Sequence, residues 1–320
     1  MDQPAPIPGE IHPDLPKPEL EESKNKTNVW LKSLSSLALY LAIGYFFFDK
    51  NWTLVIVLTG VVIFHELGHF LAMKVYNYQD LGIFFIPLMG AYVSGKKQEI
   101  SQKQSAVILL AGPVPGIILG FVLHFVAVQQ EIYFIEKVAW ILIYLNLLNL
   151  LPIYPLDGGQ LLNQLFFDNY NIISKIFMIL SAAAITWLAL FGLNQPFYPL
   201  LIIPFFLLSR MIGDIQHDRI TKKIEAEGID LMRSYEEIST EEYWKIRNAV
   251  IKYYPQLKDV HPAPPYEISP KEDQVIVIIQ NLLQRALIQD LSIAGKFLIL
   301  VIWLGCFLAP FLLSMPLRFF

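Results

Sequence analysis

The chain has 320 residues, of which 55% are hydrophobic and 16% are charged, and its mean hydropathy is +0.47. A soluble domain of this length is far less apolar, so the composition indicates a polytopic membrane protein. The single cysteine, Cys306, excludes a disulfide framework and a cysteine-ligated metal, and the formal net charge of −4 excludes the broad basic surface that nucleic acid attracts.

The first 28 residues are rich in proline and in acidic side chains. A signal peptide has the opposite pattern, a basic start followed by a short apolar core. We therefore expect residues 1–28 to form a disordered cytoplasmic tail.

Long apolar windows follow the tail. Crossing the hydrocarbon of a bilayer takes about 20 apolar residues in a helix. The window Phe197–Ile212 is short and contains Pro199 and Pro204, so we expect a kinked or partial span there. The sequence thus predicts about six or seven transmembrane helices, in the windows Trp30–Phe48, Trp52–Tyr76, Ser105–Val128, Phe134–Pro152, Ile172–Leu193, Phe197–Ile212 and Ile293–Ser314.

Basic residues near the ends of these windows predict the orientation, because cytoplasmic loops carry an excess of Lys and Arg. An amino terminus in the cytoplasm leaves only Lys50, Lys137 and Arg318 in the outer loops. The same arrangement places ten basic residues on the inner side: Lys24, Lys26, Lys32, Lys96, Lys97, Lys103, Arg210, Arg219, Lys222 and Lys223.

Residues Leu81–Gly95, between the second and third windows, are too short to cross a membrane and are rich in β-forming side chains. Pro87 and Gly90 favour a bent hairpin over a helix. Non-helical backbone occurs at membrane depth only where protein groups or water in a cavity form hydrogen bonds with its N–H and C=O groups. We therefore expect a short membrane-immersed β element that lines a cavity.

The sizeable polar segment of the chain, residues 214–291, contains helical runs and a proline-rich break. We expect a small soluble helical domain in the cytoplasm. The predicted domains are then the tail 1–28, a transmembrane domain 29–213, the helical domain 214–291 and a carboxy-terminal transmembrane helix 292–320.

The second window contains the sequence His65-Glu66-Leu67-Gly68-His69. Residues four apart share one face of a helix, so both histidines can bind one ion while Glu66 reaches its bound water. Ionisable residues inside a membrane are functional by default because they are costly there. The motif predicts a zinc site in which His65 and His69 are ligands and Glu66 is the general base.

A catalytic zinc needs a third protein ligand. Asp157 follows the apolar fourth window, on a helix that Pro152 and Pro155 break, and a cation shared with two histidines would satisfy it. The alternative is that Asp157 only forms the turn at the helix break, since Asp-Gly is an ordinary turn pair. A second alternative is a membrane zinc peptidase whose site faces the cytoplasm and whose third ligand is a downstream glutamate. The candidates Glu131 and Glu136 are expected in the short outer loop, on the opposite side of the membrane from such a site. We therefore assign Asp157 as the third ligand.

Two amides, Asn146 and Asn149, lie on the fourth window. Buried amides often only join neighbouring helices. Since polar groups in membrane helices face the bundle interior, we expect a substrate role for Asn149.

These residues resemble the site-2 proteases, a family of intramembrane zinc metalloproteases. The resemblance rests on "HELGH" at 65–69 and "NLLPIYPLDGG" at 149–159, on separate spans and in this order, and on "IPLMGAYV" at 86–93 and "AGP" at 111–113. It covers roughly residues 52–167, which would be the catalytic core. It implies zinc ligands His65, His69 and Asp157, Glu66 as acid and base, and Asn149 near the substrate backbone.

The β element of the family has its counterpart in residues 86–93, and Gly90, Ala91 and Tyr92 are the positions at which we expect substrate binding. The chain departs from the family pattern in two places. "VPG" follows "AGP" where the family often has an asparagine, and the loop 129–133 is too short for a PDZ domain.

The predicted function is that of an intramembrane zinc metalloprotease which cleaves peptide bonds within or near transmembrane segments of single-span membrane proteins, for regulated proteolysis or for signal-peptide clearance. We expect a multi-pass protein of a bacterial inner membrane. The alternatives are a non-catalytic scaffold or chaperone derived from such a protease and, more weakly, a transporter, since transporters also use broken helices at mid-depth.

Overall fold

The computed structural model describes residues 15–18, 29–87, 90–97, 100–167, 171–192, 195–231, 233, 235–264, 266–283 and 288–312. The chain divides into two compact units. Residues 25–210 and 287–320 form the larger one, here called the membrane unit. Residues 1–24 and 211–286 form the other, here called the small unit.

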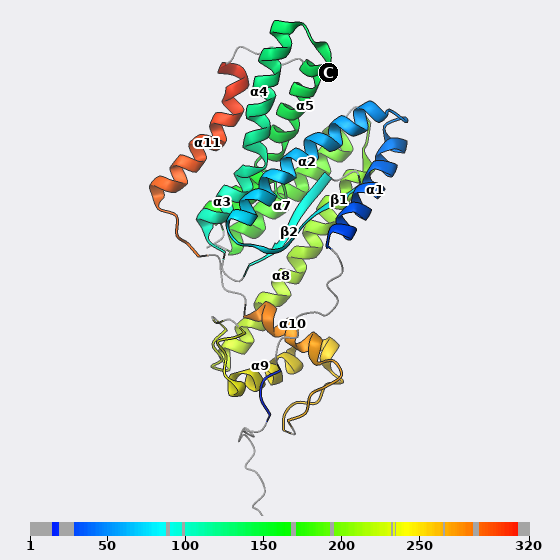
Figure 1. Cartoon of the computed structure of the whole chain (residues 1–320). Helices are drawn as coiled ribbons and strands as arrows, with labels where there is room; N and C mark the ends of the chain where they lie inside the picture. Colours follow the sequence, from blue (N-terminus) through cyan, green and yellow to red (C-terminus); the bar gives the residue numbers. More distant parts are fainter. Residues whose placement is uncertain are drawn as a thin grey trace, which may run out of the picture. The chain divides into compact units, whose positions relative to one another are not determined.

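The membrane unit is mostly helical and carries one two-stranded sheet (Figure 1). Helix α8 runs on from it into the small unit. The elements are α1 Val29–Phe47, α2 Trp52–Val75, β1 Gln79–Ile86, β2 Gly90–Lys96, α3 Gln102–Ala111, α4 Pro113–Gln130, α5 Tyr133–Asn149, α6 Asp157–Leu162, the π-helix η1 Asn163–Phe167, α7 Asn171–Trp187, the π-helix η2 Leu188–Gly192, the 3₁₀ turn η3 Tyr198–Leu201, α8 Ile202–Ala226 and α11 Ile293–Leu312.

Six helical stretches in the described residues are long and apolar enough to cross a membrane. They start at α1, α2, α3, α7, η3 and α11, and α3 with α4 counts as one span. Helix α5, which we also expected to cross, has 17 residues and falls just short of the usual length. The predicted class, a polytopic helical membrane protein with six or seven spans, is confirmed.

The helical stretch over the predicted window Phe197–Ile212 is longer than that window. The helical stretch runs from Tyr198 to Ala226, well beyond the predicted end at Ile212. Pro199 lies in the first turn of η3 and Pro204 in the first turn of α8. Proline is tolerated in a first helical turn because the N–H groups there have no intrahelical acceptor, so neither residue interrupts the helix.

Strands β1 and β2 form the predicted hairpin, an antiparallel pair with Ile86 opposite Gly90 and Phe85 opposite Ala91. Gly90 has a φ of +106°, which glycine adopts without strain. Helix α1 lies along β1, where the N–H of Phe85 donates to Ser36 Oγ at 3.1 Å. Among the described residues no further strand pairs with β2. The outer edge of β2 thus has no strand partner, whereas α1 satisfies part of the edge of β1.

The small unit contains α9 Thr240–Tyr253, η4 Pro255–Leu257 and α10 Glu272–Leu282. Helix α9 begins at a capping box, in which Ser239 and Glu242 exchange side-chain to backbone hydrogen bonds. Its apolar face packs with α10 into a core. Fully buried members of this core include Tyr243, Trp244, Ile246, Leu257, Val275 and Ile279.

Residues 15–18 differ from the predicted disordered tail. Leu15 packs against the core of the small unit, and the carbonyl groups of Leu15 and Pro18 accept hydrogen bonds from side chains of that unit. These contacts offset the entropy lost on ordering four residues. The remainder of the predicted tail, 1–14 and 19–28, lies outside the described residues.

Candidate metal centre

Helix α2 carries the histidine motif at the centre of the membrane unit. Its N-cap is Asn51, whose side chain accepts a hydrogen bond from the N–H of Leu54. Most of its residues are apolar, yet His65, Glu66 and His69 are only 6%, 6% and 8% exposed. The helical spacing therefore turns the ionisable residues inward, away from the apolar surroundings of the membrane unit.

Asp157 is brought to the same place by the broken end of α5. The chain turns after Leu150, and α6 begins at Asp157 itself. A Cβ on Gly158 would lie 1.9 Å from the carbonyl oxygen of Leu150, and one on Gly159 would lie 2.3 Å from the carbonyl carbon of Ile153. Only glycine fits at either position, and this close backbone approach holds Asp157 against α2.

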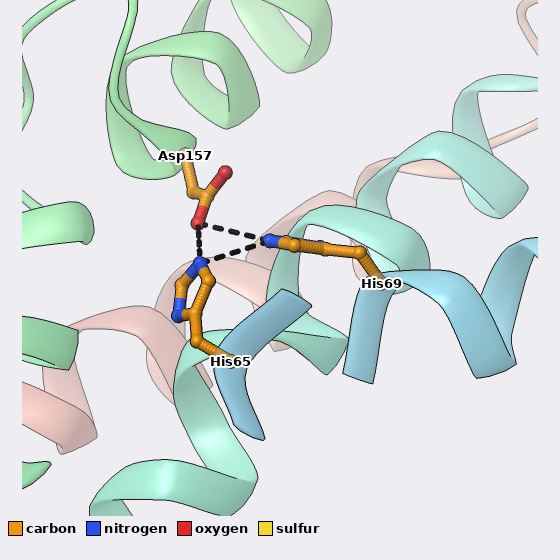
Figure 2. A group of neighbouring side chains, drawn as sticks. All are labelled: His65, His69 and Asp157. Carbon is orange, nitrogen blue, oxygen red and sulfur yellow. Dashed lines mark hydrogen bonds and ion pairs between the residues drawn. The ribbon is translucent and has the colours of Figure 1, made fainter. Parts of the chain in front are cut away.

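The two histidines and Asp157 converge on one point (Figure 2). The Nε2 atoms of His65 and His69 lie 3.0 Å apart. Oδ2 of Asp157 lies 3.1 Å from Nε2 of His65 and 3.3 Å from Nε2 of His69. The three donor atoms thus form a nearly equilateral triangle.

Hydrogen bonds on the far side of each ring define which nitrogen faces the triangle with a lone pair. Nδ1 of His65 lies 2.7 Å from Oδ1 of Asn146, and Nδ1 of His69 lies 2.7 Å from the carbonyl oxygen of Ile108. Both partners are acceptors, since the amide nitrogen of Asn146 is directed to the carbonyl of Leu142. Each Nδ1 therefore donates, and each Nε2 of the neutral ring presents a lone pair.

This arrangement fits a divalent metal. Oδ2 of Asp157 is buried and receives no hydrogen bond, although two imidazole nitrogens lie beside it. Three lone-pair atoms at such short separations repel one another unless a cation lies among them. Tetrahedral zinc with bonds of about 2.0–2.1 Å separates its ligand atoms by roughly 3.3 Å, which the triangle approaches.

Two glycines let α2 and the α3–α4 junction approach closely around the histidines. A Cβ on Gly68 would lie 1.9 Å from the carbonyl oxygen of Ala111. A Cβ on Gly112 would lie 2.3 Å from Nε2 of His69. The "AGP" sequence at 111–113 therefore has a steric reason: a larger side chain at position 112 would occupy the space of the His69 imidazole.

The remaining predicted residues lie around this centre in different ways. Glu66 follows His65 directly on α2 and is buried beside it. Asn149 is the half-buried last residue of α5. Gly90, Ala91 and Tyr92 begin strand β2, and Tyr92 is 49% exposed with its ring against Phe84.

Asn146 is the residue whose contact with the centre the sequence did not reveal. The sequence analysis assigns it no role, whereas it bonds directly to His65 and is 1% exposed. The signal that could have found it is the need of each metal-binding imidazole for an acceptor on its other nitrogen.

The alternative third ligands do not reach the histidines. Glu131 follows the last residue of α4, and Glu136 lies in the first turn of α5. Among the described residues, the cluster of possible metal ligands that contains both histidines includes neither glutamate. The geometry thus defines a polytopic membrane protein with a candidate centre of two histidines and one aspartate.

Comparison with known proteins agrees with this class. Residues 53–138 and 127–191 match the family model described as peptidase family M50. The chain is 28% identical over 182 residues to a zinc metalloprotease of Methanocaldococcus jannaschii, covering 53% of this chain and 51% of the relative. It is 31% identical over 110 residues to the stage IV sporulation protein FB of Bacillus subtilis, covering 33% of this chain and 38% of that protein.

A solved structure, the site-2 protease from Methanocaldococcus jannaschii, aligns with a TM-score of 0.40 and 22% identity over 55% of this chain and 84% of that chain. The chain spans about half the length of the first relative and less of the second. The predicted resemblance to the site-2 protease family is confirmed over residues 53–191, the part of the chain that carries both motifs. The apolar helices and the family match together support a multi-pass membrane protein.

Proposed function

We propose that this protein is an intramembrane zinc metalloendopeptidase that cleaves peptide bonds within or near transmembrane segments of single-span membrane proteins. One observation carries the proposal: three buried donor atoms from α2 and α6 converge at 3.0–3.3 Å, and both histidines are held with their lone pairs toward the shared point. The family match and the zinc metalloprotease among the relatives support a metalloprotease with zinc as its cofactor.

His65, His69 and Asp157 would hold the ion. Zinc bound there supplies a Lewis acid, which makes water acidic enough to lose a proton near neutral pH and polarises a substrate carbonyl. Glu66 accepts that proton and donates it to the leaving amine nitrogen. Its buried position next to His65 on α2 supports this role.

A transmembrane helix hides its carbonyls in its own hydrogen bonds, so a substrate must unwind before its peptide bond can be attacked. No other strand of the described residues pairs with the outer edge of β2, so an unwound segment can add there as a strand. Ala91 would bind this segment through its backbone, Gly90 and Tyr92 would lie along it, and Asn149 would bind its backbone near the ion. Substrates with glycine, proline or polar residues in the span unwind more readily and are expected to be preferred.

The proposal also includes an amino terminus in the cytoplasm and a bacterial inner membrane. The distribution of basic residues supports this orientation, since only three of the basic residues near the span ends, Lys50, Lys137 and Arg318, would then lie in the outer loops. Water would then reach the centre from the cytoplasmic side.

The test is co-expression with tagged single-span proteins, comparing the unsubstituted chain with Glu66→Gln and measuring bound metal in both after purification. We expect about one zinc per chain in both proteins and a loss of cleavage in the variant on the order of 10²–10⁴-fold, the usual contribution of a general acid–base group. Unchanged cleavage by Glu66→Gln, or an active chain without zinc, would refute the proposal.

A further inference from the structure

The small unit binds Lys17 in a way that satisfies every donor of its ammonium group. Nζ of Lys17 donates to the carbonyl oxygens of Tyr235, Glu236 and Ile238 at 2.9, 3.1 and 2.7 Å. The same nitrogen lies 5.4 Å from the centre of the Tyr235 ring, a cation–π distance. An ammonium has three N–H donors, so these carbonyls match its whole hydrogen-bonding capacity.

Aromatic side chains of the unit bind the backbone on both sides of Lys17. Nε1 of Trp244 donates to the carbonyl oxygen of Leu15 at 3.3 Å, and the hydroxyl of Tyr235 donates to that of Pro18 at 2.9 Å. The N–H of Lys17 donates to Oγ1 of Thr240 at 3.5 Å. Tyr235 and Trp244 are only 5% and 2% exposed, so their polar atoms need acceptors, which this segment supplies.

The sequence Leu15-Pro16-Lys17-Pro18 suits these contacts. Pro16 and Pro18 have no N–H, so the N–H of Lys17 is the backbone donor between them, and it has a partner in Thr240. Prolines also hold the chain extended before binding, which lowers the entropy lost on docking. Leu15 adds an apolar contact with the core of the small unit.

We propose that this surface of the small unit is a peptide-binding site which selects an extended segment with a proline-flanked lysine, and that residues 15–18 of the same chain are its occupant. The site reads three features: an apolar residue two positions before the lysine, a compact ammonium, and carbonyls of an extended backbone. Arginine, whose planar guanidinium does not fit three carbonyls arranged around one nitrogen, is expected to bind more weakly. The proposal does not depend on the metal centre.

A binding measurement in detergent solution tests the selectivity. The probe is a fluorescent peptide with the sequence of residues 11–22, and the proteins are the complete chain and its Lys17→Ala variant, in which the cis segment is weakened. A linked occupant competes at an effective concentration near the millimolar range. We expect the variant to bind the peptide at least tenfold more tightly than the unsubstituted chain does. Peptides with arginine or acetyl-lysine in place of the lysine should bind the variant at least tenfold more weakly than the lysine peptide does. Equal binding by both chains, or indifference to acetylation, would overturn the proposal.

A second measurement uses the unsubstituted chain and needs no variant. Acylation by a water-soluble reagent, followed by mass spectrometry, should modify Lys17 at least tenfold more slowly than Lys245, whose side chain is 59% exposed on the same unit. Equal rates would contradict docking. Protection that falls on dilution would show that the segment comes from a second copy, which also contradicts a cis occupant.

Two matched tyrosine variants locate the effect. Tyr235→Phe removes the hydroxyl that donates to Pro18, whereas Tyr253→Phe removes one that donates to Glu227, away from the peptide. We expect faster acylation of Lys17 only in Tyr235→Phe. The same rate increase in both variants would mean that general loosening, not loss of peptide recognition, exposes Lys17.

Discussion

His65 on α2 and Asn146 on α5 are joined by a hydrogen bond of 2.7 Å between Nδ1 and Oδ1. The amide nitrogen of Asn146 is directed to the carbonyl of Leu142, also at 2.7 Å, so the amide cannot turn without losing that bond. The asparagine thereby fixes both the tautomer and the orientation of the imidazole. A side chain on a neighbouring helix thus presets one corner of the triangle.

Replacing Asn146 with leucine should weaken zinc binding by about 10–100-fold, the usual effect of removing the acceptor behind a metal-binding imidazole. Asn146→Asp keeps an acceptor at that position and should restore much of the affinity. Zinc affinity is measured by titration against a competing chelator in detergent. Asn149→Leu, one turn further along α5, is the matched control and should leave it unchanged. Equal affinities for Asn146→Leu and the unsubstituted chain would show that the bond has no role in metal binding.

The third ligand can be tested against its rivals. Asp157→Ala should lower the zinc content of the purified protein to background, because two histidines alone leave the ion with too few protein ligands. Glu131→Gln and Glu136→Gln should each keep about one zinc per chain, since neither belongs to the group that contains both histidines. Metal analysis of the three variants decides between the assignments. Zinc retained by Asp157→Ala and lost from a glutamate variant would move the third ligand to the junction of α4 and α5.

The sequence predicted the helices and the triangle for different reasons. Long apolar windows reveal spans through length alone, and the motif spacing places His65 and His69 on one face of a helix. Asp157 was found because an unpaired carboxylate after a broken apolar helix needs a partner. These three predictions depend on local sequence patterns and on the free-energy cost of burying a charge in the membrane. Both can be judged from the sequence one residue at a time.

The contacts that were missed depend on how separate elements rotate against one another. Nothing local distinguishes Asn146 from Asn149, and only the packing of α5 against α2 turns the former toward His65. The docking of residues 15–18 was missed because composition alone favours disorder there, while the binding partners lie more than two hundred positions along the chain. The steric role of Gly112 likewise requires the position of the His69 ring.

Gly112→Ala should lower zinc affinity by at least tenfold, because the added Cβ would lie 2.3 Å from Nε2 of His69 and must displace the ring. Gly60→Ala is the control on α2, where a Cβ would meet no atom within 4 Å. Both variants are compared by zinc titration, with gel filtration in detergent to verify folding. A Gly112→Ala protein that binds zinc like Gly60→Ala would mean that the helices separate without cost to the site.

The free edge of β2 makes strand addition testable. Because the N–H of Phe85 points outward to Ser36, the alternation of an antiparallel pair directs the N–H groups of Ala91 and Val93 to the outer edge of β2. Val93→Pro removes one of these donors without touching the β1–β2 ladder, and edge strands tolerate proline. We expect at least a tenfold loss of cleavage with zinc content unchanged, while Val93→Ala stays close to the unsubstituted chain. Full activity in Val93→Pro would exclude pairing at this residue.

A buried ion pair should give the small unit a pH-dependent stability. Arg247 donates from Nε and Nη2 to the two carboxylate oxygens of Glu272 at 2.8 and 3.0 Å, and the hydroxyl of Tyr243 also donates to this carboxylate. Burial alone would raise the pKa of Glu272, but the hydrogen bonds from Arg247, Tyr243 and the N–H of Ser269 outweigh it and hold the pKa below its ordinary value. Burial and the bond to Glu272 raise the pKa of Tyr243.

These two shifts act at opposite ends of the pH scale. A lowered carboxyl pKa stabilises the folded state above the unfolded value near 4.5, and that stability is lost as the pH falls through the folded pKa. A raised tyrosine pKa stabilises it below the unfolded value of 10, and that stability declines as the pH rises above this value. The melting temperature of the small unit should therefore be highest between about pH 5 and 9 and fall on both sides.

Calorimetry of the complete chain measures this melting temperature. The transition of the small unit is assigned by its shift in Val250→Ala, which empties part of the core. Glu272→Gln should lower the melting temperature at neutral pH and flatten the acid limb, and an unchanged acid limb in that variant would place the pH dependence elsewhere.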